Sequence, residues 1–268
     1  MEATPVTQTT QTKKGLSGST LKIIAIVTMA IDHVGAALLG RLMNVSGYMQ
    51  AAYASDMTAI SEWLMANGLL YGSYMTMRMI GRIAFPIFCF LLVEGFLRTG
   101  NVKKYALRLG GFALISEIPF DLAFNAKVLE FTYQNVFFTL FLGLLTMIVF
   151  DKIIRTAWPK IVKLLLCAPV LAAGGILAEI LQTDYAATGV ICIMVLYLFR
   201  NSKPWQLVAG CAAFLWELTA PLAFIPIAFY NGERGLKLKY FFYAFYPAHL
   251  LIIYLISACM GIAGYAAI

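Results

Sequence analysis

Charged residues are scarce in this chain of 268 residues: lysine, arginine, aspartate and glutamate make up only 12% of it, whereas 61% is hydrophobic. A soluble domain typically carries about 25% charged residues and about 45–50% apolar ones. The core of a soluble domain of this size has no room for such an excess of apolar side chains. The composition therefore excludes a soluble globular domain, a disordered chain, and a collagen-like or disulfide-stabilised scaffold.

Metal-binding and nucleotide-binding patterns are also missing. His33 and His249 are the only two histidines and lie far apart in the sequence, and none of the five cysteines forms a CxxC pair. The sequence therefore predicts no metal site. The P-loop, GxSxG and HExxH motifs of soluble enzymes are absent as well.

Long apolar runs take the place of these motifs. A transmembrane helix needs about 20 predominantly apolar residues, whereas a β-barrel strand alternates apolar and polar residues over runs of about ten. The sequence therefore predicts an all-α, polytopic transmembrane helical bundle of about nine membrane segments, including a short hairpin broken by Pro221 and Pro226. The predicted segments are residues 21–42, 74–97, 105–124, 135–150, 162–181, 186–199, 205–219, 222–230 and 240–263.

The basic residues predict the orientation of this bundle in the lipid bilayer. Residues 1–19 are polar and are expected to form a cytoplasmic tail, followed by a single transmembrane domain over residues 20–268. With that tail inside, most of the 20 lysines and arginines fall in inner segments, as the positive-inside rule requires. This topology predicts a cell-membrane protein with its C-terminus outside and no nucleic-acid partner. Segment 44–72 is expected to be an external or interfacial loop with one amphipathic helix near residues 57–70.

A small set of polar side chains lies inside the predicted spans. Each buried charge costs roughly 2.5–3.5 kcal/mol on insertion scales, so such residues usually mark function. A rise of about 1.5 Å per residue places several of them at one depth, where convergence on an interior cavity costs less than exposure to lipid. The residues expected at that depth are Asp32, His33, Arg78, Arg82, Glu117, Asp121 and Asn135.

Individual roles within this set remain partly open. Adjacent helix positions point about 100° apart, so Asp32 is expected to pair with an arginine of the second span rather than with His33. Histidine titrates near neutral pH, which favours His33 as a general base, with a structural histidine as the alternative. Arg82 either pairs with Glu117 or Asp121 or contacts substrate.

Arg78, Asp184 and His249 have expectations of their own. Arg78 either joins the cavity or extends to the outer headgroups. Asp184 is expected in a solvated outer turn. His249 is expected nearer the cytoplasmic side than His33, where catalytic, donor-contacting and structural roles are all open.

The chain resembles the TraX family in motifs spread over nearly its whole length after residue 20. The resemblance includes the residues that carry most of the buried charge. The matching stretches are LKIIA at 21–25, MAIDHVG at 29–35, RMIGRIAFPIF at 78–88, EG at 94–95, SEIPFD at 116–121, NVFFT at 135–139 and YPAHL at 246–250.

The named activity of that family is N-acetylation of the N-terminus of a conjugative pilin, with acetyl-CoA as donor. The resemblance implies an integral-membrane acetyltransferase whose acceptor is a pilin-like peptide or an envelope glycan, N-acetylation being expected more than O-acetylation. A proton-coupled membrane transporter is the alternative, because buried carboxylates, arginines and histidines also form proton relays.

Acyl transfer needs a base for the acceptor proton and donors for the developing oxyanion. Asp32 and His33 are the predicted catalytic pair. Arg78, Arg82 and Asn135 are expected to contact substrate or stabilise the oxyanion, and Glu117 or Asp121 to orient the histidine or hold an amine. His249, Tyr246, Lys104 and Arg108 are expected to bind acetyl-CoA on the cytoplasmic side.

Overall fold

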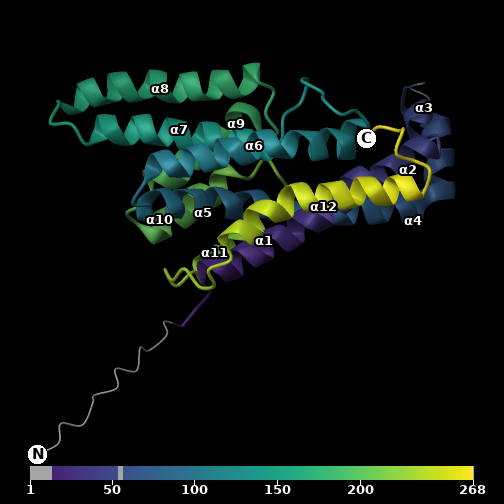
Figure 1. Cartoon of the computed structure of the whole chain (residues 1–268), viewed down its shortest axis with the longest axis horizontal. Helices are drawn as coiled ribbons and strands as arrows, with labels where there is room; N and C mark the ends of the chain where they lie inside the picture. The colour runs from purple at the N-terminus through teal and green to yellow at the C-terminus, as the bar shows by residue number, and fades with distance from the viewer. Residues whose placement is uncertain (1–13, 54–56, 268) are drawn as a thin grey trace, which may run out of the picture.

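The computed structural model describes residues 14–53 and 57–267, and most of these residues lie in helices (Figure 1). The all-α prediction is confirmed, with no strand in the two described ranges beyond isolated β-bridges. Residues 1–13 of the predicted polar tail lie outside those ranges. The helices are α1 (Gly18–His33), η1 (Val34–Leu39), α2 (Gly40–Val45), α3 (Tyr48–Tyr53), α4 (Met57–Gly81), α5 (Ala84–Arg98), α6 (Val102–Asn125), α7 (Val136–Ile154), α8 (Lys160–Ile180), α9 (Ala186–Leu198), α10 (Lys203–Ala213), η2 (Ala220–Ala223), α11 (Phe224–Ala228) and α12 (Lys239–Cys259).

Five helical stretches of the described chain are long and apolar enough to cross a membrane. These stretches make the chain a multi-pass membrane protein by length and composition, but the predicted total of about nine segments is not confirmed. Helix α6, which contains the predicted span 105–124, is not among the five. They are Gly18–Val45, Met57–Arg98, Val136–Ile154, Lys160–Ile180 and Tyr240–Cys259.

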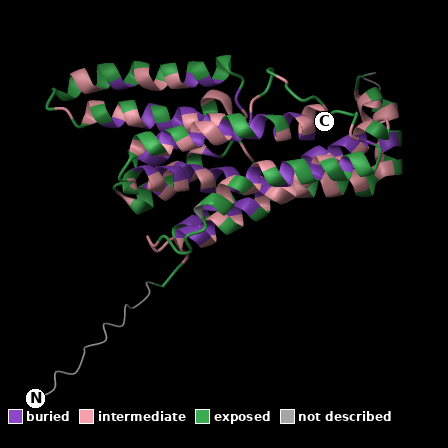
Figure 2. Ribbon diagram, viewed as in Figure 1, coloured by how far each residue is buried: buried purple, intermediate pink, exposed green. Residues whose placement is uncertain are grey.

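The helices form two groups that meet where α12 packs against α6 and where α1 packs against α5. Figure 1 shows α1, α4 and α12 lying along one another, while α5, α7, α8 and α9 form the other part of the molecule. Figure 2 shows that buried residues line the surfaces where these helices face each other, whereas most of α8 is exposed. The exposed side chains of α8 are largely leucine and isoleucine, as expected of a lipid-facing surface.

The helix expected near residues 57–70 is present, but the described residues before it, expected to form a loop, contain a further helix. Helix α3 and the first half of α4 lie in segment 44–72, and α4 continues past the predicted boundary to Gly81 with one kink at Asn67. Only Arg82 and Ile83 separate α4 from α5. This short break places Arg82 at the wall of the cavity described below.

The broken hairpin predicted around Pro221 is confirmed. Helix α10 ends at Ala213, and Pro221 lies in the first turn of the short helix η2. The Nζ atom of Lys203, at the start of α10, donates a hydrogen bond to the carbonyl of Tyr230 at 2.7 Å. The segment therefore returns to the level at which it began.

Arg41 is fully buried in α2 without a carboxylate partner among the described residues. Its Nε atom donates to the carbonyl of Tyr265 and its Nη2 atom to the carbonyl of Leu122, both at 2.6 Å. A third, longer bond joins Nη1 to Ser257 at 3.4 Å. Arg41 therefore ties the C-terminal residues and the end of α6 to α2.

We expect Arg41→Met to lower the free energy of unfolding by about 3 kcal/mol, because hydrogen bonds to a charged group contribute about 1.5–3 kcal/mol each. Thermal unfolding of the purified protein in detergent measures the effect. Lys103→Met, at an exposed position of α6, is the matched control and should change stability little. Equal melting temperatures for the two variants would contradict the stabilising role of Arg41.

Candidate functional site

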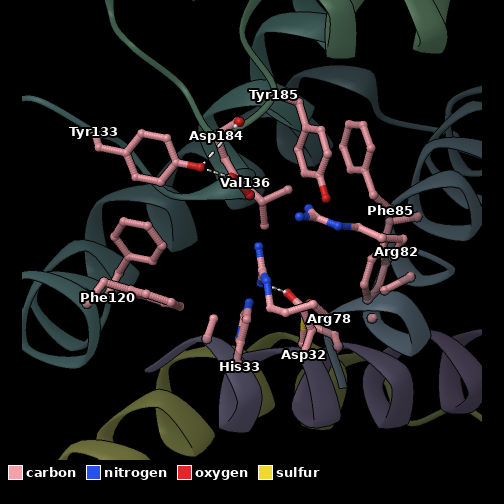
Figure 3. Close-up of a pocket in the computed structure, with 16 residues that line it drawn as sticks. Asp32, His33, Arg78, Arg82, Phe85, Phe120, Tyr133, Val136, Asp184 and Tyr185 are labelled. Carbon is pink, nitrogen blue, oxygen red and sulfur yellow. Dashed lines mark hydrogen bonds and ion pairs between the residues drawn. The ribbon is translucent and has the colours of Figure 1, made fainter. Parts of the chain in front are cut away.

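A cavity of about 200 Å³ opens between α1, the α4–α5 junction, α6 and the segments that precede α7 and α9 (Figure 3). Phenylalanines of α5 and α6 form much of its apolar wall. Its polar lining comes from four separate stretches of the chain. These polar residues are Asp32, His33, Arg78, Arg82, Tyr133, Asp184 and Tyr185.

The end of α1 places Asp32 and His33 at this cavity. The helix changes to a π-helix, Val34–Leu39, directly after His33, and single π-helical turns occur frequently at functional sites. On the facing helix, a Cβ atom at Gly81 would clash with the side chain of Asp32. The glycine therefore lets α1 and α4 approach closely enough for their polar residues to meet.

His33 forms a hydrogen bond with His249 of α12. The distance from His33 Nδ1 to His249 Nε2 is 2.7 Å. The two rings are within 7° of parallel with centroids 4.9 Å apart, which suits an in-plane bond between the two nitrogens. The expectation that His249 lies nearer the cytoplasmic side than His33 is therefore wrong.

The partners of the two histidines determine their tautomers. His249 Nδ1 lies 2.7 Å from the carbonyl oxygen of Phe245, which can only accept, so Nδ1 carries the proton. The Nε2 atom of neutral His249 is then an acceptor, and His33 Nδ1 must donate to it. This leaves His33 Nε2 unprotonated. Figure 3 shows the His33 ring pointing from α1 into the cavity.

Two ion pairs hold the arginines of the cavity. Arg78 Nη1 donates to Asp32 at 2.6 Å, which confirms the predicted pairing of Asp32 with the second span. Arg82 pairs instead with Glu217 of the hairpin at 3.0 Å, so the pairing predicted with Glu117 or Asp121 is wrong. A guanidinium has five N–H donors, and each of these ion pairs uses one. Further donors of both arginines are therefore available to a bound group.

The turn between α8 and α9 carries Asp184 and Tyr185 into the cavity rather than into solvent. Gln182 and Ala186, on either side of the pair, have positive φ angles of 49° and 43°. Such left-handed residues other than glycine cost of order 1–3 kcal/mol and tend to cluster at functional sites. Tyr133 donates a short hydrogen bond to Asp184.

Asp184 has no ion-pair partner among the described residues, whereas Asp32 pairs with Arg78 and Glu217 pairs with Arg82. Burial raises the pKa of the Asp184 carboxyl, and the Tyr133 hydroxyl and the charges of Arg78 and Arg82 oppose that rise.

Glu117, Asp121 and Asn135 lie behind the cavity wall. Asn135 caps α7 through its side-chain oxygen and donates from its amide group to Ala113 and Glu117. Asp121 accepts from the backbone N–H of Glu130 and from Asn125. All three therefore fasten the segment before α7 to α6, and none of them lines the cavity.

The residues predicted to bind the donor do not form one group. Tyr246 is buried beside His33, with ring centroids 5.7 Å apart, and so belongs to the surroundings of the histidines. Lys104 is exposed in the first turn of α6. Arg108 lies between the rings of Tyr105 and Tyr243.

The sequence did not predict Tyr133, Tyr185 or Asp184 in the cavity, nor Glu217 as the partner of Arg82. The two tyrosines were indistinguishable from interfacial anchors, since tyrosine is common at membrane boundaries. The acidic residues had a usable signal, because a carboxylate within or beside an apolar span is costly unless it has a partner.

Comparison with known proteins gives one family match and one related protein. The family model described as "TraX protein" matches residues 17–257. The chain is also similar to a probable fimbrial assembly protein, FimC of serogroup H1, from Dichelobacter nodosus. The two are 28% identical over 263 residues, covering 87% of this chain and 92% of that protein. No solved structure matches the chain.

Proposed function

The chain belongs to the TraX family, and we propose that it is an integral-membrane acetyltransferase that transfers an acetyl group from acetyl-CoA to an amine or hydroxyl acceptor. One observation carries the proposal: the cavity holds a histidine whose Nδ1 atom is fixed by a second histidine, so that its Nε2 atom is a free base. Two arginines with unused donors lie in the same cavity.

The residues of the cavity suit each proton and charge movement in acyl transfer. The donor supplies a thioester carbonyl. His33 Nε2 removes the proton from the attacking N–H or O–H group as the new bond to the carbonyl carbon forms. Unused N–H groups of Arg78 or Arg82 stabilise the charge that develops on the carbonyl oxygen. His33 Nε2 then returns its proton to the sulfur as the thiolate leaves.

His249 acts on this chemistry through His33. Its Nε2 atom accepts from His33 Nδ1 and stabilises the positive charge of the imidazolium that forms during transfer. The carbonyl of Phe245 fixes the tautomer of His249 in turn. His249 is therefore a positioning residue in this proposal rather than a donor-binding one.

The acceptor is expected to be related to pilus assembly. The matching relative carries the name of a probable fimbrial assembly protein, and the family is TraX. A pilin-like peptide would present a neutral amine to His33, and Asp184, the one cavity carboxylate without an arginine, would accept a hydrogen bond from that amine. An envelope glycan would present a hydroxyl to the same nitrogen.

Purified protein supplied with radiolabelled acetyl-CoA and an extract of membrane peptides and envelope glycans tests the proposal. We expect label to appear in one class of acceptor and free CoA to accumulate in equal amount. Proteoliposomes that transport a solute or protons without any acetyl transfer would instead support the transporter and contradict the enzyme.

We expect His249→Ala to lower kcat by about 10–100-fold while KM for acetyl-CoA changes less than twofold, because the variant leaves His33 without its acceptor. The magnitude is that of a supporting hydrogen bond rather than of the base itself. His249→Gln should recover part of the loss, since its amide oxygen can accept from His33 Nδ1. Steady-state kinetics of the two variants measure this. A main effect on KM for acetyl-CoA would contradict the positioning role.

A further inference from the structure

A second group of charged side chains lies at the end of the bundle where α1 begins, three helical turns before His33. Lys22 of α1, Arg108 of α6 and Arg234 of the segment before α12 form this group, here called the basic cluster. The backbone N–H of Ser19 donates to the carbonyl of Arg234 at 3.0 Å, which places Arg234 at the first turns of α1. Lys22 and Arg108 lie over the rings of two adjacent residues of α12, Phe242 and Tyr243.

Aromatic rings of α6 and α12 hold two of these cations in place. Lys22 Nζ lies 5.4 Å from the centroid of the Phe242 ring. Arg108 Cζ lies 5.4 Å from the centroids of both Tyr105 and Tyr243. Cation–π contacts of this length restrict the side chains, so the positive charges are fixed rather than spread through solvent.

The basic cluster lacks the acceptors that such cations normally find. Neither Lys22 nor Arg108 forms an ion pair with a carboxylate in the described part of the chain. The Nε atom of Arg108 is buried without any hydrogen-bond partner. An arginine that served only membrane topology would extend its donors into water. A buried N–H group without an acceptor costs free energy, and an anionic ligand would supply the acceptor.

Helix α1 connects the basic cluster to the cavity. Lys22, Ile26, Met29 and His33 recur at intervals of three or four residues and share one face of the helix. Lys22 and His33 are eleven residues apart, which is about 16 Å along the axis at about 1.5 Å per residue. Met29 still lines the cavity, one turn before His33.

We infer that the basic cluster binds the phosphate groups of the acyl donor while the donor's thioester lies at His33. The inference rests on the proposed acetyl transfer. CoA suits this separation, because a linear pantetheine arm joins its phosphates to its sulfur. Ile26 and Tyr246 are buried between the two places, so entry of the arm requires their side chains to move.

Binding of CoA to the purified full-length chain, measured by isothermal titration calorimetry, tests the inference. Arg108→Gln should weaken binding at least about tenfold, the loss expected of a charge-assisted hydrogen bond. Lys103→Gln removes the same charge from an exposed position five residues earlier on α6 and should change Kd less than twofold. Equal weakening in both variants would show that only the surface potential matters and would overturn the inference.

A truncated donor separates phosphate binding from folding. S-acetyl-pantetheine lacks the nucleotide phosphates, so Arg108→Gln should use it as well as the wild-type protein does, while its KM for acetyl-CoA rises about tenfold. Equal losses with both donors would assign Arg108 a structural role and overturn the inference. If the wild-type protein transfers acetyl groups and Arg108→Gln does so equally well, this inference alone is overturned. If the wild-type protein does not bind CoA, the proposed function is overturned as well.

Discussion

His33→Gln is expected to lower the rate of acetyl transfer by about 10²–10⁴-fold, the contribution typical of a general base. Glutamine keeps the size of the side chain and can still donate a hydrogen bond to His249 Nε2, but it cannot accept and later return a proton. The fold should therefore persist while turnover is lost. Single-turnover measurements with radiolabelled acetyl-CoA give the rate of the chemical step directly.

Donor binding is the control for this variant. The basic cluster lies about 16 Å along α1 from His33, so CoA should bind His33→Gln with nearly wild-type affinity. Thermal unfolding should also be little changed. Near-normal turnover in His33→Gln would rule out the base and direct attention to Asp184, the unpaired carboxylate of the cavity.

Gly81→Ala should cost at least about 10²-fold in activity and measurably lower the melting temperature. The added Cβ atom would clash with the side chain of Asp32, so α1 and α4 must separate or Asp32 must turn away from Arg78. Either movement breaks the 2.6 Å ion pair and displaces the neighbouring His33. A displacement of about 1 Å in a catalytic site is enough to cost about 10²-fold.

The same helix offers a matched control. Gly72 of α4 has no atom within 4 Å of the position that a Cβ would take. Gly72→Ala should therefore be neutral or slightly stabilising, by the roughly 0.5–1 kcal/mol that alanine gains over glycine in a helix. If the two alanine variants had equal activity, the close approach of α1 and α4 would have no role in the site.

The helical class was predictable from the sequence, because the apolar runs admit no other structure in a membrane. The broken hairpin was predictable too, since Pro221 removes a backbone donor. The helix near residues 57–70 was predicted as well, but its continuation to Gly81 and the break at Arg82 and Ile83 were not. The π-helix after His33 has no signature in residue type or spacing.

A contact in the site was predictable only where a buried charge had one possible kind of partner. Asp32 needed a cation, and the second span supplied Arg78. The His33–His249 pair was missed because depth was counted from the first residue of each span. The segment before α12 runs along the first turn of α1, where the backbone N–H of Gly18 donates a hydrogen bond to the carbonyl of Glu233. Helix α12 therefore begins further along α1 than that turn, and His249 lies level with His33. Arg82 forms its ion pair with Glu217 rather than with a carboxylate of α6, because the hairpin folds back beside α4.

Mass spectrometry of small membrane peptides and envelope glycans, from cells that lack the protein and from cells that produce either the wild-type chain or His33→Gln, tests the central claim most directly. The account predicts one class of molecule that carries an acetyl group only when the wild-type chain is present. Identical acetylation in all three cell types would contradict it, as would full acetylation in cells that produce His33→Gln.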